Sequence, residues 1–270
     1  MRSRRRQCAT ARRKLHGVKL KEALEGGKLH VGCCGWCERR ERYFQHFRVI
    51  ELQDPFYQPP STELASKWRQ AAPEGFIFTL KAWQLITHPA SSPTYRRLKQ
   101  PIPADRAKAY GSFQPTPEVQ QAWQTTAAVA RALNAAAIVF QCPASFKPEP
   151  SNVRNLRSFF KAVERENRLF CWEPRGSWEP ELVRELCQEL DLIHCVDPFV
   201  TQPVYGQACY FRLHGRGGYN YQYQQDELLE LVRRCWQLLE TGHEPIYVMF
   251  NNVYMRDDAQ RFLKLLRETA

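Results

Sequence analysis

The sequence predicts an α/β fold, a single (β/α)8 barrel of the TIM type with a long loop after strand three and a shortened helix after strand six. Short apolar runs recur through the chain, and helix-like segments separate most of them. The length of 270 residues is also close to the roughly 250 typical of one such barrel. The predicted strands span residues 29–34, 48–52, 76–82, 136–142, 169–174, 192–197, 208–214 and 246–252.

The early connections differ from one another. Residues 38–47 read as a short helix, whereas the prolines of residues 54–60 are expected to delay the next helix until Ser61, which can cap it. The third strand is followed by a long, proline-rich segment over residues 84–117. Loops of this length in compact domains usually serve function, so we expect a lid or substrate-shaping loop there.

The later connections are mostly helical. The short, proline-rich segment 198–207 between strands six and seven is expected to lack a full helix. The remaining predicted helices span residues 118–134, 151–166, 179–190, 225–240 and 256–268.

Positive charge is concentrated at the start of the chain. Residues 1–28 carry +8 of the net charge of +11, and we expect them to form a disordered basic extension ahead of a barrel domain over residues 29–270. Such an extension can attract nucleic acid. It lacks the apolar core of a secretory signal, which favours a cytoplasmic location. No apolar stretch approaches the roughly 20 residues that span a membrane, so we expect no membrane association.

Polar side chains follow most of the predicted strands. Within a strand they recur two residues apart, as in Glu51 and Gln53 or Arg212 and His214, so they share one face. We therefore predict a ring of polar groups at the carboxyl end of the barrel, where active sites of this fold lie. The members of this ring are Glu51, Gln53, Thr79, Lys81, Gln141, Glu173, Arg175, Asp197, Arg212, His214 and either Asn251 or Asn252.

Acidic and basic side chains are balanced in this ring. Interleaved cations argue against a dedicated divalent-metal site and instead suit an anionic ligand such as a phosphate or carboxylate. The predicted acid or base catalysts are Glu51, Glu173, Asp197 and His214. The predicted substrate-binding residues are Lys81, His88, Gln141, Arg175, Arg212, Tyr219 and Asn251. Tyr219 belongs to a Gly/Tyr-rich segment, residues 215–223, whose tyrosines could stack on a base or sugar.

Three cysteines cluster at the end of the first predicted strand. Cys34 and Cys37 form a C-x-x-C motif next to Cys33, a spacing that suits a disulfide or a soft metal. A second C-x-x-C, which a four-cysteine zinc site would need, is lacking in the sequence. Small packing residues are therefore the favoured interpretation, and Cys-bound metal or redox chemistry stays an alternative.

Several longer motifs together resemble the YecE-like family, also called domain of unknown function family 72, over about residues 29–268. The motifs are VGCCGW, VIELQDPFYQPPS, FTLKAWQLITH, VFQCPASF, CWEPRGSW, YFRLHGR with GYNYQY, and VMFNN followed by DDAQRFLKLL. The resemblance implies a TIM barrel and supports most of the polar ring as family motif positions. It also supports His88, which ends the FTLKAWQLITH motif, but it supplies no reaction. The barrel is similar in outline to the endonuclease four and xylose isomerase group, which favours nucleic-acid or sugar-phosphate ligands.

Three functions therefore remain open from the sequence. The favoured one is an enzyme acting on an anionic, phosphate-bearing small molecule or nucleic acid at the barrel mouth. The alternatives are a nucleic-acid-binding protein without catalysis and a Cys-dependent metal or redox protein. Cofactor and oligomeric state are not predicted.

Overall fold

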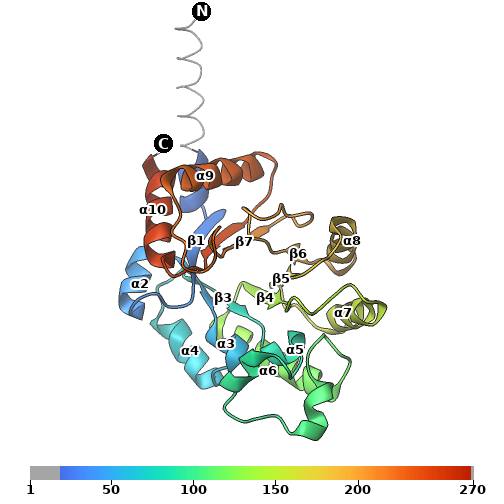
Figure 1. Ribbon diagram of the computed structural model, residues 1–270. Helices are drawn as coiled ribbons and strands as arrows, with labels where there is room; N and C mark the ends of the chain where they lie inside the picture. The colour runs from blue at the N-terminus through green and yellow to red at the C-terminus, as the bar shows by residue number, and fades with distance from the viewer. Residues whose placement is uncertain (1–18, 269–270) are drawn as a thin grey trace, which may run out of the picture. The chain divides into compact units, whose positions relative to one another are not determined.

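The computed structural model describes residues 19–268, over which parallel strands alternate with helices (Figure 1). The strands are β1 (Leu29–Cys34), β2 (Val49–Leu52), β3 (Ile77–Lys81), β4 (Ala137–Gln141), β5 (Leu169–Glu173), β6 (Ile193–His194), β7 (Cys209–Leu213) and β8 (Ile246–Phe250). The longer helices are α2 (Arg40–His46), α4 (Thr62–Ala71), α6 (Pro117–Leu133), α7 (Pro150–Ala162), α8 (Pro180–Leu190), α9 (Gln225–Glu240) and α10 (Met255–Glu268). The predicted α/β barrel class is confirmed.

Both predicted departures from a regular barrel are present. After β3 the chain takes more than thirty residues to reach α6, forming only the short helices α5 (Gln84–Thr87), η1 (Pro93–Arg97) and η2 (Ala104–Ala109). After the two-residue strand β6, no helix precedes β7. Ser61 caps α4 as expected, because its Oγ accepts a hydrogen bond from the Leu64 amide at 3.2 Å.

The described residues form two compact units. The first, which we call the terminal unit, comprises residues 19–48, 196–202 and 207–268. Its strands are ordered β1-β8-β7, with Val248 opposite both Val31 and Phe211. Helix α10 packs against β1 and β8, and α9 lies beside α10 (Figure 1).

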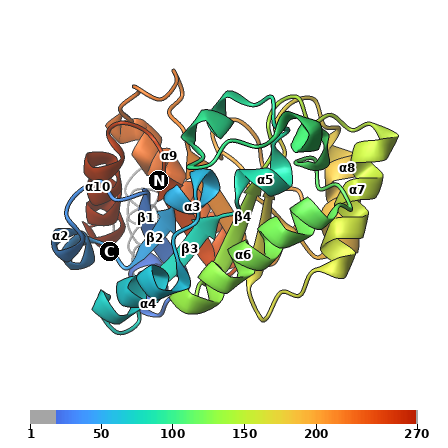
Figure 2. The same ribbon diagram turned by 90° about the horizontal axis from the view of Figure 1, so that it is seen from below.

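The second unit, which we call the central unit, comprises residues 49–195 and 203–206. Its strands are ordered β6-β5-β4-β3-β2, and α7 lies beside α8 (Figure 2). An aromatic cluster fills the space between β4, β5 and the helices, with neighbouring ring centroids 4.9–6.3 Å apart. Its members are Phe113, Trp123, Phe140, Phe159, Phe160 and Phe170.

Two expectations about local structure are wrong. Residues 19–25, expected to be disordered, form a helix that buries Leu20 and Ala23, while residues 1–18 of the predicted extension lie outside the described part. The segment expected to stay non-helical before Ser61 contains the one-turn helix α3 (Asp54–Tyr57). Pro55 permits this turn because proline at the first helical positions removes no hydrogen bond that the helix would make.

Two further expectations concern burial. The strand cysteines Cys142, Cys171, Cys195 and Cys209 are all buried, as expected for small core residues. Over residues 19–268, no helix combines the length and the apolarity that crossing a bilayer requires.

Candidate functional site

Strand register places four of the predicted residues on one face of the central unit. Glu51 lies opposite Thr79, and Gln141 lies opposite Glu173. Lys81 shares the face of Thr79 because the two are two residues apart on β3. Lys81 in turn lies opposite Val139, which shares the face of Gln141. The carboxyl ends of β2 to β5 therefore present Glu51, Lys81, Gln141 and Glu173 to the same side.

His88 joins this group through an aromatic contact. The Lys81 Nζ lies 3.5 Å from the ring centroid of Phe56, and the His88 ring meets the same phenyl ring at 4.9 Å between centroids. Both Lys81 and His88 are 5% exposed. A phenyl face attracts an ammonium group through its quadrupole, so Phe56 provides a surface on which the buried Lys81 cation is stabilised.

The electrostatic environment of His88 favours the neutral ring. Burial, followed by the positive charges of Lys81 and Arg175, lowers the pKa of His88 from 6.5 to about 3. The ring Nδ1 is 2.7 Å from the Thr87 hydroxyl oxygen. At neutral pH, His88 is therefore an uncharged imidazole that feels two nearby cations.

Glu173 is paired with a cation at the strand end. Its Oε1 accepts two hydrogen bonds from Arg175, from Nε at 2.8 Å and from Nη2 at 2.6 Å. The Glu173 carboxylate is 7% exposed and the Arg175 side chain 38% exposed, so the guanidinium is the more accessible partner. On β2, Glu51 is fully buried and accepts a hydrogen bond from the Gln53 side-chain amide. We refer to Glu51, Lys81, His88, Glu173 and Arg175 as the strand-end cluster.

The long segment after β3 is fastened next to this cluster. The amides of Gly111 and Phe113 donate to the carbonyls of Leu85 and Ile86, at 2.8 and 2.9 Å. Tyr95 donates its hydroxyl proton to the His88 carbonyl at 2.7 Å. In addition, the guanidinium carbon of Arg97 lies 3.4 Å from the ring centroid of Tyr57, which belongs to α3. The expected loop is therefore ordered and tied to α3 and α5.

The terminal unit carries the other predicted residues. Arg212, fully buried, lies opposite Met249, so His214 and Asn251 share its face by the two-residue repeat. Asp197 accepts the His214 amide proton at 2.9 Å on Oδ2, and the His214 Nδ1 lies 3.7 Å from the same oxygen. Each unit thus gathers its predicted residues on one face. That both sets surround a single cavity stays a prediction.

The Gly/Tyr-rich segment is mostly structural. Tyr223 is fully buried and accepts the Gly215 amide proton at 2.9 Å, so the expectation that it stacks on a ligand is wrong. Tyr221 donates to the Glu227 carboxylate at 2.8 Å. Tyr219 is 57% exposed and is the member of the segment whose predicted role in binding stays a prediction.

The cysteine cluster differs from the C-x-x-C expectation. The Sγ of Cys37 lies 3.8 Å from that of Cys33, whereas Cys34 belongs to the opposite face of β1. Within residues 19–268, no three His, Cys, Asp or Glu side chains are grouped so that they could hold a metal ion. A three-cysteine metal site formed by Cys33, Cys34 and Cys37 therefore does not match the structure.

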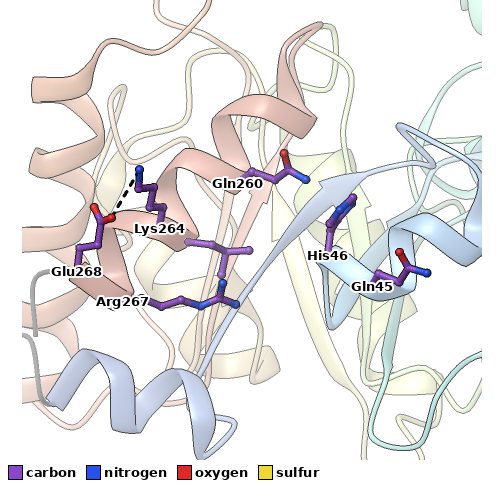
Figure 3. A pocket seen from close by; sticks show the side chains of 7 residues that line it. Gln45, His46, Gln260, Lys264, Arg267 and Glu268 are labelled. Carbon is purple, nitrogen blue, oxygen red and sulfur yellow. Dashed lines mark ion pairs between the residues drawn. The ribbon is translucent and has the colours of Figure 1, made fainter.

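A surface pocket of about 380 Å³ lies between α2 and α10 in the terminal unit (Figure 3). It is lined by Gln45, His46, Gln260, Leu263, Lys264, Arg267 and Glu268. Lys264 and Glu268 pair across 3.6 Å and are both exposed, so their charges are largely screened by water. None of the predicted site residues lines this pocket.

The family model described as "Protein of unknown function DUF72" matches residues 30–270. The chain belongs to the DUF72 family. The resemblance to the YecE-like family is thereby confirmed. A comparison with curated proteins gives no match.

Solved structures confirm the fold of this DUF72 protein. A DUF72 family protein from Enterococcus faecalis V583 is 19% identical with a TM-score of 0.67, over 89% of this chain and 98% of that one. Another, from Thermotoga maritima MSB8, is 21% identical with a TM-score of 0.65, over 88% and 99%. D-psicose 3-epimerase from Clostridium cellulolyticum H10, solved with D-tagatose, is 11% identical with a TM-score of 0.57, over 90% and 99%.

Two buried polar residues of the DUF72 chain were not among the sequence candidates. Gln84 is fully buried, and its Oε1 has no hydrogen-bond partner among the described residues although its Nε2 donates to the Tyr57 carbonyl at 3.2 Å. Burial lowers the pKa of His194 to about 4, and its Nδ1 accepts the Val204 amide proton at 3.2 Å. His194 lies within the sixth apolar run, where a histidine reads as a strand residue rather than a functional one.

Proposed function

We propose that this DUF72 protein is an enzyme that converts a small anionic sugar derivative, such as a sugar phosphate, at the carboxyl ends of β2 to β5. The observation that carries the proposal is the strand-end cluster itself. It combines two cations, two carboxylates and a neutral imidazole at the place where barrel enzymes bind their substrates.

The cations of the cluster suit the anionic part of such a substrate. Arg175 carries a planar guanidinium that can bind phosphate or carboxylate oxygens in a bidentate manner, and it is the more exposed partner of its ion pair. Lys81 adds a second positive charge from β3, on the same face as Glu173. A phosphate beside the Arg175 guanidinium would replace part of its hydration by charge-assisted hydrogen bonds.

The remaining groups suit proton transfer. Glu51 and Glu173 are buried carboxylates that can act as general bases on a carbon-bound or hydroxyl proton. The neutral His88 can donate an N–H hydrogen bond to a developing oxyanion, because its low pKa keeps it uncharged. D-psicose 3-epimerase, solved with D-tagatose on a similar fold, supports a sugar as the substrate class.

A thermal-shift series tests the binding part. A phosphorylated ketose should raise the melting temperature more than inorganic phosphate, and its unphosphorylated counterpart should raise it least, because ligand binding stabilises the folded state by mass action. Arg175→Gln should weaken the phosphorylated ligand about tenfold to hundredfold, the effect of losing hydrogen bonds to a charged group. Arg157→Gln is the matched control, since Arg157 lies on α7 and pairs with Glu185 and Glu189 of α8 near the surface, away from the strand-end cluster.

Proton exchange in deuterated water tests the catalytic part. Incubation of the ketose phosphate with the protein in D2O should remove the NMR signals of protons next to the carbonyl carbon. Glu51→Gln and Glu173→Gln should slow this loss by about a hundredfold or more if their carboxylates remove the proton. Tight binding without any exchange would contradict catalysis, and equal shifts from charged and neutral sugars would contradict the anion site.

A further inference from the structure

Cys33 and Cys37 form a thiol pair that the proposed function does not use. Their Sγ atoms are 3.8 Å apart, and both cysteines are free. Closing a disulfide of about 2.05 Å from that separation needs a movement of less than 2 Å. We propose that Cys33 and Cys37 are a peroxide-sensing pair that forms a reversible disulfide, and this inference stands independently of the proposed function.

Strand geometry explains why the partner of Cys37 is Cys33 rather than Cys34. Cys33 lies opposite Phe250 on β8, and successive side chains of a strand point to opposite faces. The side of β1 that Cys33 occupies also holds Tyr43, whose hydroxyl accepts the Cys33 amide proton at 2.9 Å. Cys34 therefore points away from this side, even though the sequence spacing Cys34–Cys37 fits the redox motif.

The connection after β1 holds Cys37 in place. Gly35 adopts φ +106°, a conformation that turns the chain back and that side-chain-bearing residues rarely adopt. Trp36 then packs edge-on against Tyr43 and Phe44 of α2, with centroids 5.2 and 5.7 Å apart. The turn at Gly35 and the packing of Trp36 thus bring the Cys37 side chain back next to Cys33.

The two thiols differ in the way that peroxide chemistry requires. The hydrogen bond with Cys33 lowers the pKa of Cys37, and this effect outweighs the opposing effects of burial and of the Glu38 charge. Burial raises the pKa of Cys33 well above its usual range. Cys37 is half-buried and Cys33 is fully buried, so the thiol that ionises more readily is also the one that a small oxidant can reach.

The reaction proceeds in two balanced steps. The Cys37 thiolate attacks one oxygen of hydrogen peroxide, so that an S–O bond forms, the O–O bond breaks, and hydroxide leaves as Cys37 becomes a sulfenic acid. The Cys33 sulfur then attacks the Cys37 sulfur, the S–S bond forms, and the hydroxyl group leaves with the Cys33 proton as water. A dithiol reductant reverses the disulfide by exchange.

Mass spectrometry of the full-length protein tests this pair. The protein is exposed to equimolar hydrogen peroxide, alkylated under denaturing conditions and digested. The peptide that contains residues 33–37 should lose the mass of two hydrogens and keep one alkylated cysteine, and dithiothreitol should restore all three alkylation sites. Persistence of three alkylated cysteines after peroxide treatment would overturn the proposal.

Serine variants identify the partners. Cys34→Ser should keep the disulfide, whereas Cys33→Ser should abolish it and leave Cys37 as a sulfenic acid that dimedone captures. Equal disulfide yield in Cys33→Ser would show that Cys34 is the partner and would sink the inference. Because Cys33 is fully buried, Cys33→Ala serves as a second variant, and a melting curve of each establishes that it is folded.

Discussion

Phe56 organises the strand-end cluster at the scale of single residues. Its ring contacts both the Lys81 ammonium and the His88 imidazole, so one apolar side chain positions a buried cation beside a buried neutral imidazole. Lys81 was predicted from the sequence because it is a polar residue at the end of an apolar strand, and His88 because it lies in a motif of the family that the chain resembles. Phe56 was not, because an aromatic residue in a proline-rich connection has no pattern that distinguishes a cluster position from ordinary packing.

The low pKa of His88 predicts a pH dependence of stability. Between pH 6.5 and about pH 3, the unfolded chain binds a proton at this residue and the folded chain does not. The contribution of His88 to the free energy of unfolding is therefore fully present above pH 6.5. It falls by about 1.4 kcal/mol per pH unit as the pH drops through this window. Urea unfolding of the wild type and of His88→Gln, at several pH values across the window, measures this pH dependence.

The readout for His88 is the slope rather than the absolute stability. His88→Gln should give a shallower decline of the unfolding free energy with falling pH, whatever the substitution does to stability at neutral pH. Parallel pH profiles for the two proteins would show that His88 does not carry this linkage.

At the scale of elements, the segment between β3 and α6 is held by main-chain groups. Gly111 has φ +80°, and a Cβ at this position would lie 2.1 Å from the His88 carbonyl oxygen. The sequence predicted a long proline-rich loop here but not its attachment, because hydrogen bonds between backbone atoms leave no trace in side-chain patterns. The one-turn helix α3 was missed for a different reason: Pro55 falls at a first helical position, where proline is compatible with a helix.

Gly111→Ala should therefore loosen this segment. The steric clash and the left-handed backbone should together destabilise the protein by more than about 2 kcal/mol, since the added atom meets backbone that cannot rotate away. Trypsin should then cut faster at the exposed basic residues Arg96, Lys99 and Lys108.

Gly75 provides the matched control for this substitution. It also has positive φ, +73°, but nothing lies within 4 Å of a Cβ built there. Gly75→Ala should cost only about 1 kcal/mol from backbone strain and leave the tryptic pattern unchanged. Similar destabilisation in both variants would mean that the close approach to His88 is unimportant.

At the scale of the whole molecule, the fold class was the most predictable property. Eight apolar runs, most of them separated by helices, predict a barrel even when individual helix ends shift by a few residues. The candidate site was predictable within each unit, because alternation along strands places Glu51, Lys81, Gln141 and Glu173 on one face. The substrate was not, since the residues that bind anions are shared by many reactions.

The basic start of the chain predicts a separate, non-specific affinity for polyanions. Removal of residues 1–18, which are rich in arginine, should weaken binding of single-stranded DNA. The slope of the logarithm of the binding constant against the logarithm of the salt concentration should become shallower by about 0.7 for each phosphate that the shortened protein no longer neutralises. Fluorescence anisotropy at several salt concentrations measures this slope. Unchanged DNA binding by the shortened protein would instead favour a nucleic-acid site within residues 19–268.

The main-chain hydrogen bonds that hold the segment after β3 also affect how much sequence change this segment can tolerate. Bonds from the amides of Gly111 and Phe113 to α5 involve none of the side chains between Pro89 and Tyr110, of which Tyr95 and Arg97 make further contacts. Mutations there can reshape the border of the strand-end cluster without detaching the segment. Substitutions at these positions, in evolution or in a directed library, can therefore change ligand preference while the barrel scaffold is preserved.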